Sequence, residues 1–186
     1  RSKESVIKEA EKLTQMPDFK GYIHDVGGPT ANFRGPSCNK KSMCKNNKHC
    51  LAPEPCPNMK VSHTEYAEML RELRALPKVK KVFIRSGIRF DYVIADPDER
   101  FFKELIRHHV SGQLKVAPEH VSDRVLKYMG KPSFTVYEKF KDRFYELTKS
   151  EGKKQYLVPY LMSSHPGSTV NDAIKLARFL KKEGLH

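Results

Sequence analysis

Short apolar segments alternate with amphipathic helical segments along this chain of 186 residues. Strands that alternate with helices in this way predict parallel βαβ units and an α/β fold. The four strands are expected at residues 22–26, 79–86, 112–117 and 155–162. Because four parallel strands cannot close a barrel, the expected sheet is either a small open one or an arc of a larger barrel.

Residues that favour helix starts define where several helices should begin. Ser2 is the candidate N-cap of a helix over residues 2–14, and Asp96-Pro97 should open another helix. Two capping boxes are expected, one formed by Ser62 with Glu65 and one over residues 135–138.

The last strand and the last helix carry the clearest expectations about burial. Residues 155–162 are apolar almost throughout, which predicts a strand that is covered on both faces. The final helix should bury the apolar face made by Val170, Ala173, Ile174, Ala177 and Leu180.

Length and composition indicate one domain, residues 1–186, which is part of a longer protein. The first residue is Arg1 rather than Met, and the chain opens directly on a helix. No apolar run approaches the roughly 18 residues of a membrane span, and no signal peptide is recognisable. We therefore expect an internal piece of a cytoplasmic protein with no membrane partner.

The formal net charge of +13 allows two interpretations. A strongly basic chain can bind RNA or another polyanion. The positive residues are, however, spread along the chain rather than clustered on one helix face, which is typical of a lysine-rich solvated surface. A missing acidic segment of the longer protein would also leave such an excess.

All four cysteines lie in one proline-rich segment, an insertion at about residues 27–61. Cys38, Cys44, Cys50 and Cys56 recur with five residues between neighbours. Clustered cysteines in a chain that is not secreted favour a metal site, and thiolates bind zinc or an auxiliary iron–sulfur cluster. Disulfides made by air oxidation and free thiols remain alternatives, and His49 or His63 could replace one thiolate.

Polar segments that contain glycine or proline follow every predicted strand. In parallel α/β folds, ligands bind beyond the carboxyl ends of the strands. Arg89 and Lys115 suit a carboxylate or a phosphate, Glu119 suits an ammonium group or ribose hydroxyls, and the N–H groups at Ser168 and Thr169 suit an acceptor group. A zwitterionic ligand with a ribose would fit this set.

Three phrases of the sequence carry a family resemblance. Residues 25–33 (DVGGPTANF), 115–120 (KVAPEH) and 155–160 (QYLVPY), with the later His-Pro-Gly, resemble radical S-adenosylmethionine (radical SAM) enzymes, and within them the YgiQ-like family. The resemblance covers essentially the whole chain. It implies parallel βα repeats that form a four-stranded arc of a partial TIM-like (β/α)₆ barrel.

The resemblance also implies a function and its site residues. The whole protein would bind S-adenosylmethionine (SAM) and a four-iron four-sulfur cluster, and would generate a 5′-deoxyadenosyl radical with an electron donor such as flavodoxin or ferredoxin. Its substrate and its catalytic residues cannot be named from this chain. The implied SAM-binding residues are Gly27, Gly28, Pro29, Ser86, Arg89, Lys115, Glu119, His165, Pro166 and Gly167.

One departure from the family pattern limits what this chain can do alone. It contains no Cys-x₃-Cys-x₂-Cys, so the cluster strand is expected just before Arg1 and a last strand after His186. The chain alone should neither hold the radical cluster nor cleave SAM. The alternative function is a basic binding module that is stabilised by a structural metal bound at the four cysteines, with RNA as a partner.

Overall fold

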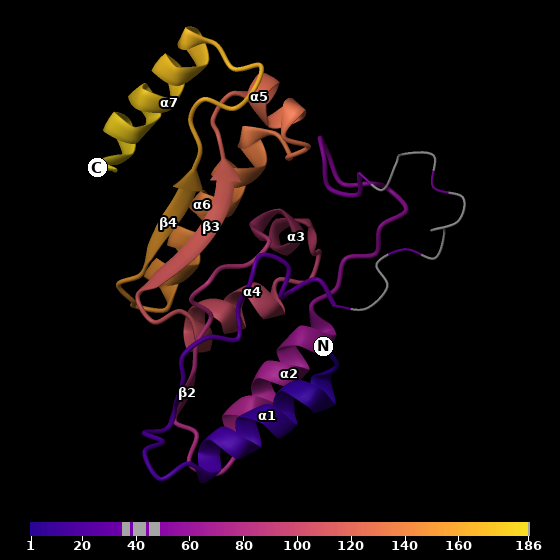
Figure 1. Ribbon diagram of the computed structural model, residues 1–186, viewed down its shortest axis with the longest axis vertical. Coiled ribbons are helices and arrows are strands. Elements are labelled where there is room, and N and C mark those ends of the chain that lie inside the picture. The colour runs from indigo at the N-terminus through magenta and orange to yellow at the C-terminus, as the bar shows by residue number, and fades with distance from the viewer. Residues whose placement is uncertain (35–37, 39–43, 45–48, 186) are drawn as a thin grey trace.

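The computed structural model describes residues 1–34, 38, 44 and 49–185, and it has a mixed α/β architecture (Figure 1). Helices α1 and α2 lie side by side at one end of the molecule, and α6 lies behind β3 and β4. The elements are α1 (Lys3–Gln15), β1 (Tyr22–Ile23), α2 (Thr64–Ala75), β2 (Lys81–Val82), α3 (Phe90–Ala95), α4 (Arg100–Glu104), the π-helix η2 (Leu105–His109), β3 (Gln113–Glu119), α5 (Asp123–Tyr128), α6 (Phe134–Ser150), β4 (Tyr156–Leu161) and α7 (Val170–Glu183).

The four expected strands are present and form two parallel pairs. Strand β1 pairs with β2, with Ile23 opposite Val82, and β3 pairs with β4, with Leu114 opposite Leu157. Strands β1 and β2 are shorter than expected, but the contact between them continues, because Val26 N–H donates to the Phe83 carbonyl at 2.8 Å. In the described residues the strands form two two-stranded sheets rather than one ladder.

An aromatic core fills the space between the strand pairs and the helices. Phe140 of α6 is fully buried and stacks on Phe102 of α4, with ring centroids 5.0 Å apart. The apolar residues that recur along one face of α2 (Tyr66, Met69, Leu70 and Leu73) and of α6 (Tyr137, Phe140, Phe144 and Leu147) are all buried. This core therefore packs side chains of the helices against side chains of the strands.

The first predicted helix start is confirmed, whereas the capping box at Ser62 is wrong. Ser2 caps α1 by accepting a hydrogen bond from Ser5 N–H at 3.2 Å. Helix α2 instead has His63 as its N-cap residue, without a side-chain cap. The carboxylate of Glu65 is engaged elsewhere, because it accepts from Arg34 Nε at 3.1 Å.

The other two predicted helix starts are also wrong. Asp96 ends α3 instead of opening a helix, and its Oδ2 accepts from His63. Helix α6 begins at Phe134 with Ser133 as its N-cap residue, so the capping box expected over residues 135–138 is absent, and the Phe134 N–H instead donates to Asp123 of α5 at 2.7 Å. In both places a partner distant in sequence decides the helix boundary.

Strand β4 and helix α7 expose apolar faces that the sequence predicts to be covered. Tyr156 and Tyr160 of β4 are 57% and 67% exposed, so only one face of this strand is buried. Helix α7 buries Leu176 and leaves Val170 75% exposed. These expectations are wrong for the described residues, because neighbouring elements cover only one side of β4 and α7.

We predict that Phe140→Ala lowers the free energy of unfolding by about 3–5 kcal/mol, since it removes a fully buried ring and leaves a cavity. Lys139→Ala, on the exposed side of the same helix, is the matched control and should change it by less than about 0.5 kcal/mol. Urea unfolding of the two variants measures the difference. Equal midpoints would contradict the assigned core.

Candidate functional site

A cavity of about 370 Å³ lies where segments that follow the strands come together. Five of the ten residues implied for SAM binding line it, namely Pro29, Ser86, Arg89, Lys115 and Glu119. The rest of its wall includes Thr30, Gly87, Ile88, Phe90, Asp91, Val116, Ala117, Lys131, Pro132 and Tyr160. All four strands or the segments just beyond them therefore contribute to one cavity.

Two charged groups in this cavity have unused bonding capacity. The Lys115 side chain is exposed, and its ammonium forms no hydrogen bond or ion pair within the part of the chain that the structure describes. Glu119 accepts from Lys131 Nζ at 3.2 Å through Oε1, while its buried Oε2 has no hydrogen-bond partner among the described residues. A ligand with an anionic group and a donor group would satisfy both.

Glu119 is also held in an unusual backbone conformation. Its φ angle is +68°, in the left-handed region that non-glycine residues seldom adopt. Such strain persists only where the surroundings fix it, and it clusters at ligand sites. The Met162 N–H donates to the Glu119 carbonyl at 2.7 Å, which ties this position to the end of β4.

Arg89, in contrast, is already committed to a neighbour. Its Nε donates to Asp91 Oδ1 at 2.8 Å, its second nitrogen contacts Oδ2, and its guanidinium lies 5.6 Å above the centre of the Phe33 ring. The hydrogen bond that Arg89 donates to Asp91 raises the pKa of Arg89. The Arg89 guanidinium thus forms part of the cavity wall, and only some of its N–H groups remain free to bind a ligand.

Gly27 serves close packing, and neither of the two glycines after β1 lines this cavity. A Cβ at Gly27 would lie 2.8 Å from Asp25 Oδ1 and 2.9 Å from the Gly87 carbonyl, so no side chain fits. Gly28 N–H donates to that same Gly87 carbonyl at 2.9 Å. Gly27 therefore allows the segment after β1 to lie against the segment after β2, and the Gly28 N–H bonds the two segments together.

His165, Pro166 and Gly167 likewise lie outside the cavity lining, in the loop from β4 to α7. His165 Nδ1 donates to the Pro166 carbonyl at 2.8 Å, and the Gly167 carbonyl accepts from Arg124 at 3.0 Å. A Cβ at Gly167, whose φ is +85°, would lie 3.0 Å from the ring of Tyr128. The structure therefore gives Gly167 a packing role against α5.

Asp172 at the start of α7 fixes this loop. Its carboxylate accepts from Ser122 Oγ at 2.6 Å, from Thr169 N–H at 2.8 Å and from Arg124. These bonds, the one from Ser122 first, hold the pKa of Asp172 far below its usual range. The Thr169–Asp172 pair is a capping box that the sequence analysis missed.

The sequence analysis also missed a buried chain of hydrogen-bonded polar groups beside the cavity. Asn32 is fully buried; its Oδ1 accepts from Arg89 N–H at 2.9 Å, and its Nδ2 donates to the Arg89 carbonyl at 3.0 Å and to His63 Nε2 at 3.1 Å. The His63 Nδ1–H donates to Asp96 at 2.6 Å. Burial lowers the pKa of His63, although Asp96 opposes this. Both ring nitrogens are engaged, so His63 is not available to a metal.

The second half of the cysteine segment packs against the rest of the molecule. Leu51 and Ala52 are buried, and Ser133 N–H donates to the Pro53 carbonyl at 3.4 Å. Burial raises the pKa of Cys50, and the thiols of Cys44, Cys56 and Cys38 raise it further. Among the described residues no three metal-ligating side chains form a ready ligand set. The other residues of this segment, 35–37, 39–43 and 45–48, lie outside the described residues.

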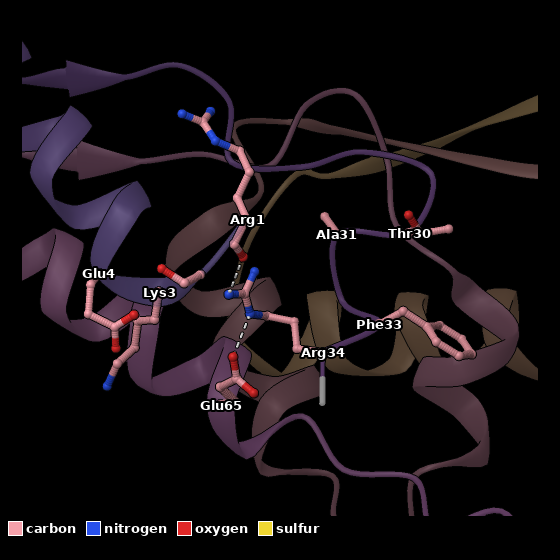
Figure 2. A pocket seen from close by; sticks show the side chains of 9 residues that line it. Arg1, Lys3, Glu4, Thr30, Ala31, Phe33, Arg34 and Glu65 are labelled. Carbon is pink, nitrogen blue, oxygen red and sulfur yellow. Dashed lines mark hydrogen bonds and ion pairs between the residues drawn. The ribbon is translucent and has the colours of Figure 1, made fainter. Parts of the chain in front are cut away.

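A second, wider hollow of about 580 Å³ lies on the other side of the segment after β1, between that segment and the start of α1. Figure 2 shows Arg34 in its centre, held between the Arg1 carbonyl and Glu65. None of the residues implied for SAM binding lines this hollow, and its central cation already has an acidic partner. We therefore place the candidate site in the smaller cavity.

We predict that Asp25→Ala destabilises the protein by roughly 1 kcal/mol at neutral pH. The Asp25 carboxylate accepts from Gly27, Arg85 and Ser86 N–H, and the estimate is at the low end because the residue is exposed. Burial alone would raise the pKa of Asp25, but these hydrogen bonds outweigh it and lower the pKa below 3.8.

The sign of the pH dependence follows from that depressed pKa. The stabilisation by Asp25 is fully present above pH 3.8 and is lost as the pH falls through the folded-state pKa. Urea unfolding of wild type and variant from pH 7 to pH 3 should therefore show a difference that shrinks in acid. A difference that grows in acid would contradict the assigned hydrogen bonds.

Comparisons with known proteins show extensive sequence similarity to longer proteins. A UPF0313 protein of Clostridium perfringens (strain SM101 / Type A) is 59% identical over 184 residues, which cover 97% of this chain and 28% of the relative. A UPF0313 protein of Clostridium botulinum (strain Okra / Type B1) is 58% identical over 187 residues, or 99% of this chain and 29% of the relative. No family model and no solved structure matches.

The chain therefore spans less than a third of the length of the curated relatives it matches. No helix in the described ranges is long and apolar enough to cross a membrane. Along nearly all of its own length, the chain is homologous to a segment of proteins that carry the name UPF0313.

Proposed function

We propose that this chain is part of a radical SAM enzyme and that its 370 Å³ cavity holds SAM. The observation that carries the proposal is the meeting of Pro29, Ser86, Arg89, Lys115 and Glu119 in one cavity. These residues come from distant parts of the sequence, and the family resemblance implies each of them.

The chemistry of the cavity suits a zwitterion with a ribose. The Lys115 ammonium would pair with the methionine carboxylate of SAM, since it has no acidic partner among the described residues. The free Oε2 of Glu119 would accept from the ammonium group or a ribose hydroxyl. Ile88, Phe90 and Tyr160 supply apolar surface for the adenosyl portion, in keeping with the mostly apolar walls of small-molecule sites.

The partial (β/α)₆ barrel is part of the same proposal. An apolar groove of about 280 Å³ runs along β1, lined in part by Ile23, Val26, Met69 and Leu73. In the described residues β1 pairs only with β2, so its other edge is open. The strand that carries the radical cluster would pack into this groove, and a flavodoxin or ferredoxin in the cytoplasm would supply the electron.

The four-iron four-sulfur cluster would be held by cysteines outside this chain, and when bound it would supply the electron for SAM cleavage. The residues present here would bind and orient the SAM molecule. Lys115 would hold the carboxylate end, Glu119 would fix a donor group, and the apolar wall would keep water from the adenosyl portion.

The alternative of a basic RNA-binding module has less support from the contacts. Most arginines form ion pairs with acidic side chains of the same chain, for example Arg71 with Glu104, Arg107 with Glu151 and Arg143 with Glu99. These arginines are therefore less available to phosphate groups. The positive excess then rests mainly on dispersed lysines, as a solvated surface would have.

We predict that Lys115→Met weakens SAM binding by the full-length protein about tenfold, equivalent to about 1.4 kcal/mol, because it removes the cation that faces the carboxylate. Equilibrium dialysis with labelled SAM measures the affinity. Lys154→Met, at an exposed lysine just before β4, is the matched control and should bind like wild type. Equal affinities of the Lys115→Met variant and wild type would place the ligand elsewhere.

A further inference from the structure

A smaller cavity of about 270 Å³ lies next to the candidate site. We call it the Arg85 cavity. Its lining residues are all basic or neutral, namely Arg85, Ser111, Gly112, Gln113 and Lys115. Lys115 lines the 370 Å³ cavity as well, so the two cavities are neighbours.

Backbone contacts between the end of β2 and the region of β3 fix the shape of the Arg85 cavity. The Ile84 N–H donates to the His109 carbonyl, shortly before β3, at 2.9 Å. A Cβ at Gly87 would lie 2.9 Å from the Lys115 carbonyl, so the segment after β2 lies directly against β3. The backbone beneath the cavity is therefore held without any help from the charged side chains.

The charged side chains of the two strands share the open face. Side chains along a strand point alternately to its two faces. After β2, Ile84 is buried and Arg85 is exposed, and on β3 the buried Leu114 separates the exposed Gln113 and Lys115. Arg85, Gln113 and Lys115 thus project away from the core and into one cavity.

Arg85 differs from most arginines of this chain. Arg85 and Arg178 are the two whose guanidinium groups form no ion pair among the described residues, whereas every other arginine is paired with an acidic side chain. The Arg85 N–H donates to Asp25 Oδ1 at 2.9 Å, so its backbone is anchored while its guanidinium is not engaged. An anion in the cavity would relieve the repulsion between this guanidinium and the Lys115 ammonium.

The neighbouring strand offers apolar surface beside these cations. In the parallel register of β3 and β4, Tyr156 lies opposite Gln113 and Val158 lies opposite Lys115. Tyr156 and Val158 are 57% and 36% exposed. A ligand with one anionic end and an uncharged body would therefore find a partner for each part.

We propose that the Arg85 cavity binds the anionic group, a carboxylate or a phosphate, of a small-molecule substrate. The planar guanidinium of Arg85 offers paired N–H donors to such a group, and the Ser111 hydroxyl and the Gln113 amide can donate as well. A volume just below the roughly 300 Å³ of small-molecule sites suits one end of a ligand. The role as a substrate subsite rests on the proposed function, whereas anion binding itself does not.

The first test is labelling of the full-length protein with phenylglyoxal, followed by peptide mass mapping. Inorganic phosphate or succinate, at an ionic strength held constant with sodium chloride, should slow the labelling of Arg85 about threefold at about twice its dissociation constant. Arg178, which also lacks an ion pair among the described residues, is the control and should label at an unchanged rate. Protection by either anion supports the proposal and shows which anionic group the site prefers.

Two kinds of result would overturn the proposal. Labelling of Arg85 that neither anion slows, or that slows only as much as labelling of Arg178, would mean that no specific site exists. An Arg85 that resists labelling before any anion is added would be paired with another part of the whole protein.

Equilibrium dialysis separates this inference from the proposed function. Arg85→Met should weaken binding of the protecting anion about tenfold and keep SAM affinity within about twofold of wild type, with Arg178→Met as the matched control. Arg85 lines only the smaller cavity, and its backbone hydrogen bond survives the substitution. Anion binding at Arg85 without SAM binding would refute the proposed function alone. Undiminished anion binding by Arg85→Met would overturn the inference drawn here.

Discussion

The buried amide of Asn32 is the group on which the arrangement around the cavity most depends. It pairs with both backbone groups of Arg89 and with the ring of His63, and it has no contact with solvent. Without it, the Arg89 N–H and an imidazole nitrogen would lose their partner at once, while the Arg89 carbonyl would keep only the Val93 N–H; each buried group left unpaired costs about 1–3 kcal/mol. Asn32 thus joins the segment after β1 to the segment after β2 and to α2.

Two carboxylates play comparable roles at other strand ends. Asp25 binds the backbone N–H groups of Arg85 and Ser86, and Asp172 ties the loop after β4 to Ser122. Polar residues after parallel strands thus serve two purposes in this molecule. Some position the strand ends, and others face the cavity. Lys115 and Glu119 are the charged groups with capacity left for a ligand.

The sequence predicts the buried elements of this fold better than their boundaries. The apolar spacing in α2 and α6 identifies the core correctly, because burial of large side chains dominates there. Helix starts failed where tertiary partners took the capping groups, as His63 did with Asp96 and Arg34 with Glu65. The exposed faces of β4 and α7 could not be anticipated, since apolar patterning does not reveal which neighbours are present.

The site was predictable for a similar reason and to a similar extent. The family resemblance implied ten SAM-binding residues, and half of them line the cavity. It did not reveal that Arg89 is already hydrogen-bonded to Asp91 or that Gly27 serves close packing. Asn32 gave no distinct signal, because a buried asparagine in a loop is recognisable only from its partners. Contacts between segments distant in sequence decide these roles.

The most direct test of the account is 5′-deoxyadenosine formation by the full-length protein, purified without oxygen and supplied with SAM and a strong reductant. The account predicts that 5′-deoxyadenosine forms and that its formation requires an iron–sulfur cluster held by cysteines outside this chain. No 5′-deoxyadenosine from protein with an intact four-iron cluster and saturating SAM would contradict the central claim.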